Sequence, residues 1–129
     1  MPAKALLQTT PSLASPLPVM LRRHPRSTPW LRVLREVLQL AGPQAQFQRH
    51  GERPWLSATF SGARHAMVLA FDGLEAITDG ETFIAALPDH EFTVPRHLVA
   101  DAVVTAMEHI VLPAPRLTVE IELLVLEEA

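Results

Sequence analysis

Histidines and carboxylates gather in the middle of this sequence, and these side chains can bind divalent cations such as Mg²⁺, Mn²⁺ or Zn²⁺. Four of them, within residues 72–101, are the candidate metal or acid/base residues: Asp72, His90, His97 and Asp101. His97 and Asp101 are four residues apart, so a helix would place them on one face. The competing interpretation is that the helix face with His97 and Asp101 is simply the solvated face, and that residues 89–91 form a loop.

A second group of residues has the composition of a small-molecule site. We expect residues 50–55 to connect two strands of a hairpin, which would place His50 opposite Trp55 on one face of the sheet. Polar neighbours complete this candidate ligand face, which consists of His50, Trp55, Gln48 and Ser57. The alternative is that the two rings pack together at the end of a strand. His65 is expected at the rim of the core, as a structural histidine rather than a catalytic base.

Basic residues are concentrated in the first half of the chain. Residues 1–64 hold nine Lys or Arg and two acids, whereas residues 65–129 hold two Arg and twelve acids. The candidate anion contact is the cluster Arg22, Arg23 and Arg26. No aromatic side chains are interleaved with these arginines, and the net charge is only -3, so we do not expect a nucleic-acid-binding protein.

Composition excludes several other classes of protein. The chain has no Cys, so disulfides, thiolate zinc sites and cysteine nucleophiles are absent. Its five Gly occur singly and match neither a phosphate loop nor a dinucleotide-binding motif, and no cofactor is predicted. No apolar run reaches the roughly 18 residues that cross a bilayer, and no secretory leader is recognisable. We therefore expect a cytoplasmic protein without a membrane partner, and the Arg-rich, Lys-poor composition suggests a bacterial source.

The elements that would position these residues follow from periodicity and from the Pro and Gly positions. Residues 1–28 are rich in Pro and predict an extended arm, and residues 29–129 predict a single α+β domain. Within that domain we expect a helix over 29–41, three strands within 44–71, one or two helical pieces over 74–87, a helix over 95–110 and a strand over 117–126. The predicted fold is a two-layer α+β sandwich with a largely antiparallel four-stranded sheet, helices on one face, and the order α-β-β-β-α-α-β.

Two predicted strands are apolar on both faces, which leaves apolar side chains for an interface. The candidate interface residues are Val68, Ala70, Leu124 and Leu126. Together with the arm, they make a non-enzymatic module that self-associates as a homodimer, or binds another protein, the preferred hypothesis. A small metal-dependent enzyme and an anion-binding arm are the alternatives.

Overall fold

A computed structural model of the chain describes residues 29–128. The chain divides into two compact units, Met1–Arg32 and Val33–Ala129. Of the first unit, only residues 29–32, the first turn of a helix, are described. The predicted arm, with Arg22, Arg23 and Arg26, therefore lies outside the described residues.

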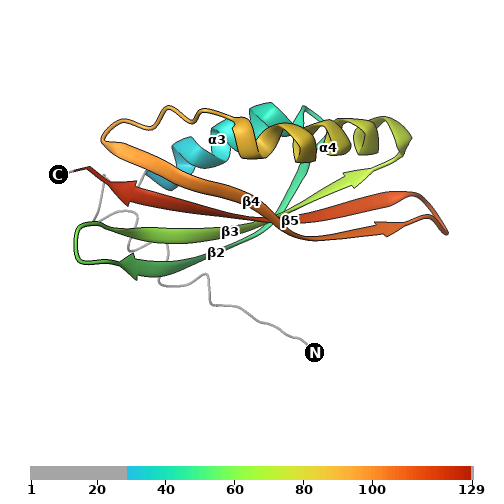
Figure 1. Cartoon of the computed structure of the whole chain (residues 1–129). Coiled ribbons are helices and arrows are strands. Elements are labelled where there is room, and N and C mark those ends of the chain that lie inside the picture. Colours follow the sequence, from blue (N-terminus) through green and yellow to red (C-terminus); the bar gives the residue numbers. More distant parts are fainter. Residues whose placement is uncertain (1–28, 129) are drawn as a thin grey trace. The chain divides into compact units, whose positions relative to one another are not determined.

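The described residues form the predicted α+β fold, with two helices and a four-stranded antiparallel sheet (Figure 1). The elements in chain order are α3 (Pro29–Ala41), β2 (Gln46–Leu56), β3 (Ser61–Asp72), α4 (Leu74–Ala86), the 3₁₀ helix η2 (Leu87–Asp89), β4 (His97–Ile110) and β5 (Arg116–Glu127). The strand order in the sheet is β2-β3-β5-β4, so β2 and β4 are the edge strands among the described residues. No helix in this part of the chain has the length and apolar character needed to span a membrane.

The helices cover one face of the sheet, which we call the helix-side face (Figure 1). Val33, Val37 and Ala41 recur at helical spacing along α3 and are fully buried. From the sheet, the buried side chains of this face alternate along β3 and β5: Met67, Leu69, Phe71, Leu117, Val119, Ile121 and Leu123. These residues form the hydrophobic core.

Close packing of α4 on the sheet depends on Gly80. A Cβ atom at this position would lie 2.9 Å from the Phe71 ring and 3.0 Å from Leu117 Cδ2. The absence of a side chain therefore lets the helix backbone approach the sheet, which offsets the low helical propensity of glycine.

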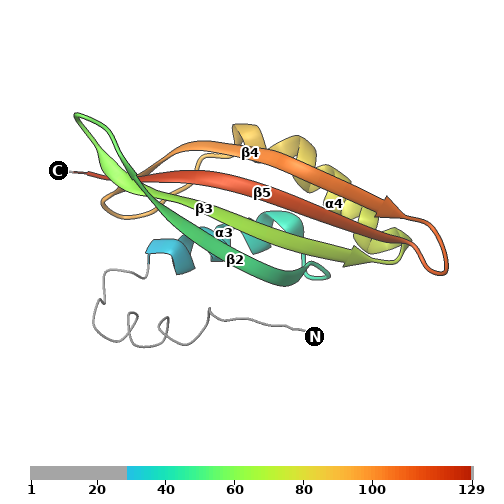
Figure 2. The same cartoon turned by 90° about the horizontal axis from the view of Figure 1, so that it is seen from below.

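The opposite face carries neither of the helices in residues 29–128, so we call it the helix-free face; it is seen in Figure 2. Residues that are paired across antiparallel strands point to the same side, so the register identifies its members. From the inner strands they include Arg64, Ala66, Val68, Ala70, Glu120, Glu122, Leu124 and Leu126; from β4 they include Leu98, Asp101, Val103, Ala106, Glu108 and Ile110.

The prediction of a helix over residues 95–110 is wrong, because His97–Ile110 is the edge strand β4. Pro95 and Arg96 form a tight turn, in which Arg96 has a φ of 65° and His97 N donates to the Val94 carbonyl at 3.0 Å. Register shifts leave Ala100 and Thr105 without partners on β5. These two bulges break the strict alternation of a strand, so the apolar residues recur at intervals that resemble a helix.

The predicted hairpin connection at residues 50–55 is also wrong, because β2 continues without interruption to Leu56. Pro54 has no backbone N–H group to donate. It is tolerated there because β2 is an edge strand, whose outer side needs no hydrogen-bond donor. The turn follows at Ser57–Phe60, where Ser57 Oγ accepts bonds from the backbone N–H groups of Thr59 (3.3 Å) and Phe60 (3.0 Å). With both corrections the order of helices and strands is α-β-β-α-β-β rather than α-β-β-β-α-α-β.

Candidate functional site

The four residues predicted as a metal or acid/base site each have another partner or position. The Asp72 carboxylate lies 3.2 Å from Arg116 Nη1 and accepts a bond from Gln46 Nε2 at 2.9 Å. His90 Nε2 is 3.0 Å from Glu36 Oε1, and His97 Nδ1 is 2.9 Å from the Pro95 carbonyl. Asp101 lies on the helix-free face, opposite Leu124.

The sheet register separates these residues widely. Asp72 pairs with Arg116 and His97 pairs with Glu127, at the two ends of β5. Eleven residues of a strand span roughly 36 Å. The structure therefore does not bring Asp72, His90, His97 and Asp101 together, because Pro95–Ile110 is not the helix on which that grouping depended.

The predicted ligand face is not assembled either. His50 pairs with Met67 and lies on the helix-side face, whereas Trp55 pairs with Gly62 and lies on the helix-free face. Gln48 is the extra residue of a bulge in β2, and Ser57 belongs to the turn after the strand. The four side chains are spread along one strand and its turn instead of facing each other across a hairpin.

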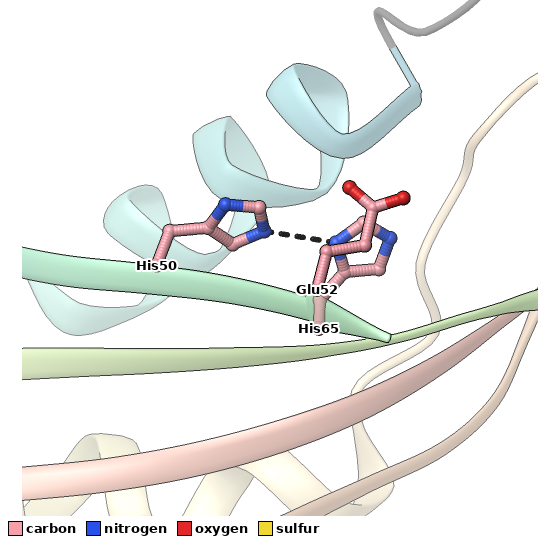
Figure 3. Close-up of side chains that lie close together, drawn as sticks. All are labelled: His50, Glu52 and His65. Atoms are coloured by element: carbon pink, nitrogen blue, oxygen red, sulfur yellow. Dashed lines mark hydrogen bonds between the residues drawn. The ribbon is translucent and has the colours of Figure 1, made fainter. Parts of the chain in front are cut away.

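A different group of side chains converges on the helix-side face: His50 and Glu52 from β2, and His65 from β3 (Figure 3). His50 Nε2 lies 2.9 Å from His65 Nδ1, and one potential ligand atom from each of the three residues lies within 4.8 Å of the others. The imidazole rings are stacked, with centroids 5.2 Å apart and planes inclined by 19°. We call this group the histidine cluster.

The local sequence explains why the cluster forms. His50 and Glu52 are two residues apart on a regular part of β2, so their side chains point to the same side. His65 is the direct partner of Glu52, and Met67 is the partner of His50, so His65 is diagonal to His50. Two strands of one hairpin are thus sufficient to place all three groups.

Burial controls the charge of both imidazoles. His65 is only 5% exposed and His50 is half-buried. Desolvation lowers the pKa of His65 to about 4. The pKa of His50 is also lowered to about 4, first by desolvation, then by repulsion from His65, against an opposing effect of Glu52. Both rings are therefore neutral at pH 7, and each carries one N–H group and one lone pair.

The four candidate interface residues share the helix-free face. Val68 and Ala70 of β3 and Leu124 and Leu126 of β5 are 8% exposed or less. Apolar side chains of the neighbouring strand β4 are more exposed: Leu98 is 51%, Val103 37% and Ile110 39% exposed. The accessible apolar side chains of this face are therefore on the edge strand, which the sequence had suggested to be a helix.

Sequence reasoning missed the histidine cluster although a signal was present. His50-Gly51-Glu52 has the alternation of a strand that presents two ligands on one side, and His65 follows after a distance compatible with a hairpin. Placing the hairpin connection at residues 50–55 concealed this pattern. The Ser57 turn, which sets the true register, was the informative feature.

Comparison with known proteins adds no functional assignment. No protein-family model, curated protein or solved structure matches this chain. The candidate functions therefore rest on the geometry of its own residues.

Proposed function

We propose that this protein is a self-associating module that forms a homodimer through the helix-free face of its sheet. The observation that carries the proposal is the combination of exposed apolar side chains on β4, at Leu98, Val103 and Ile110, with opposite charges at the two edges of the same face. Apolar side chains gathered on one face are characteristic of protein interfaces. We place this dimer in the bacterial cytoplasm, in keeping with the composition.

Charge complementarity favours a second copy of this chain as the partner. Arg49 and Arg53 lie on the β2 edge of the helix-free face, whereas Asp101 and Glu108 lie on the β4 edge. A two-fold axis parallel to the strands would place β4 of one protomer over β2 of its partner. Acidic side chains would then face basic ones twice, as a two-fold interface requires.

Edge-to-edge pairing of β4 is a poorer arrangement. The bulges at Ala100 and Thr105 interrupt the regular spacing that a second ladder would need. Packing through the face involves the side chains of β4, and the two bulges in its backbone do not interfere with it. We therefore assign the interface to the face.

The test is the mass of the full-length protein in solution, measured by light scattering during size-exclusion chromatography from about 1 to 100 μM. We expect a dimer for the wild type. Val103→Asp, which places a charge among the exposed apolar side chains of β4, should give a monomer. Leu74→Asp, at an exposed position of α4, is the control and should remain dimeric. A monomeric wild type, or a dimeric Val103→Asp variant, would overturn the proposal.

A charge-reversal series tests the orientation. Arg49 lies level with Val68 and Glu120, and therefore with Ala106 on β4, two positions from Glu108. Arg49→Glu and Glu108→Arg should each weaken the dimer, and the double variant should restore it. A double variant weaker than either single variant would exclude this arrangement, and a hetero-complex formed only with another protein would show that the partner is not a second copy.

A further inference from the structure

We propose that the histidine cluster is a binding site for a divalent transition metal, with Zn²⁺ as the preferred ion. The site would consist of His50 Nε2, His65 Nδ1 and a carboxylate oxygen of Glu52. It lies on the helix-side face and is independent of the proposed dimer interface.

The separation of the two nitrogens is close to the value that a zinc ion requires. Zn–N bonds of about 2.0–2.1 Å at a tetrahedral angle place two ligand nitrogens roughly 3.3 Å apart. His50 Nε2 and His65 Nδ1 are 2.9 Å apart, so a small opening of the pair would admit the ion. The carboxylate of Glu52, which Figure 3 shows beside the two rings, completes a three-sided arrangement.

The protonation states also suit a metal ion. Neutral imidazoles bind metals without first losing a charge-bearing proton. In the hydrogen bond between the rings, one nitrogen donates its proton to the lone pair of the other. Metal binding needs both lone pairs, so the donating ring must move its proton to its other nitrogen, Nδ1 of His50 or Nε2 of His65. This exchange of tautomers releases no net proton.

The ligand set favours transition metals over Mg²⁺ and Ca²⁺. Two imidazole nitrogens and one carboxylate suit Zn²⁺, Co²⁺ or Ni²⁺, whereas Mg²⁺ and Ca²⁺ prefer sites made entirely of oxygens. Glu52 supplies one negative charge against the two positive charges of the ion. Since Glu52 is exposed, the fourth coordination position would face solvent and hold water or another ligand.

The ligand on β3 is held rigidly, whereas the two ligands on β2 can shift. His65 is held in the core on the inner strand β3, so its nitrogen has a fixed position. Glu52 and His50 lie on the edge strand β2, whose outer side has no neighbouring strand in residues 29–128. The edge strand can therefore make the small shift that opens the nitrogen pair.

The experiment is calorimetric titration of chelator-treated full-length protein with ZnCl₂, with Mg²⁺ as the comparison ion. We expect one Zn²⁺ per chain, no measurable heat from Mg²⁺, and a Tm that rises with Zn²⁺ concentration, because binding to the native state alone stabilises it. Titration with Co²⁺ should produce the visible absorption bands of a four-coordinate ion.

Matched variants locate the site. His50→Gln and Glu52→Gln should each weaken Zn²⁺ binding by about tenfold or more, a loss at least as large as that from removing an outer-shell partner. His97→Gln is the control and should bind Zn²⁺ as the wild type does. His50 and Glu52 lie on the edge strand outside the main core, so these variants remain informative if His65→Gln does not fold. Absence of Zn²⁺ binding by the wild type, or unchanged binding by His50→Gln and Glu52→Gln, would overturn the proposal.

Discussion

Acid should destabilise this protein through two histidines, His50 and His65. The pKa values of His50 and His65 are lowered to about 4 in the native state, against 6.5 for a histidine exposed to water. Between pH 6.5 and 4 the unfolded chain binds protons at these rings and the native chain does not. The free energy of unfolding therefore falls as the pH falls through this window.

The magnitude follows from the size of the shift. A lowering of the pKa from 6.5 to about 4 corresponds to about 3 kcal/mol for one histidine once the pH reaches 4. Part of the His50 shift comes from His65, so the two contributions are coupled. We expect the wild type to lose at least about 3 kcal/mol between pH 7 and pH 4, a large fraction of the stability of a small domain.

Urea denaturation at a series of pH values, in the presence of a chelator, measures this loss. His65→Leu should lose at least about 3 kcal/mol less than the wild type across the same range, because one buried ring is gone and the other no longer faces it. His97→Gln should keep the wild-type pH dependence. Identical pH profiles for the wild type and His65→Leu would refute the reasoning.

Two substitutions test the packing that holds the helices in place. Gly80→Ala should lower the stability to urea by about 1–3 kcal/mol, because its Cβ would lie 2.9 Å from the Phe71 ring; a stabilised variant, as helical propensity alone predicts, would contradict this. Glu36→Ala should cost about 1–3 kcal/mol in the same assay, because its carboxylate bonds both His90 Nε2 (3.0 Å) and the Thr93 backbone N–H (2.9 Å); a change below about 0.5 kcal/mol would show that these bonds do not stabilise the loop.

The α+β class, the first helix and the last strand could be predicted from the sequence, because they depend on local signals. Helix α3 has apolar residues at helical spacing and ends at Gly42, whose φ of 98° suits glycine and whose N–H bonds the Leu38 carbonyl. Strand β5 alternates regularly over most of its length. Both patterns are complete within one segment.

Strand β4 could not be predicted from periodicity because of its bulges. On its helix-side face the residues are 99, 102, 104, 107 and 109, with gaps of three and two in turn. A helix face has gaps of three and four, so an irregular strand of this kind is easily taken for a helix. The β-branched residues Val103, Val104 and Thr105 favoured a strand, but this propensity is weaker than the periodic signal it opposed.

The histidine cluster depends on pairing between strands, which no single segment specifies. The same holds for His65, which was expected at the rim of the core; the true register pairs it with Glu52 and buries it. A hairpin connection misplaced by a few residues was enough to separate side chains that the structure brings to 2.9 Å. The geometry of the histidine cluster is therefore set by the Ser57 turn and not by the residues of the cluster themselves.

The two bulges of β4 also bear on how this strand can change length over evolution. Inserting or deleting one residue within a regular strand inverts every side chain beyond that point, moving core residues to the surface. Ala100 and Thr105 have no opposite residue in the register with β5, so loss of either would restore continuous pairing and leave the neighbouring side chains on the faces they now occupy. Strand β4, with 14 residues against 12 in β5, therefore has two positions at which single-residue insertions and deletions can be tolerated.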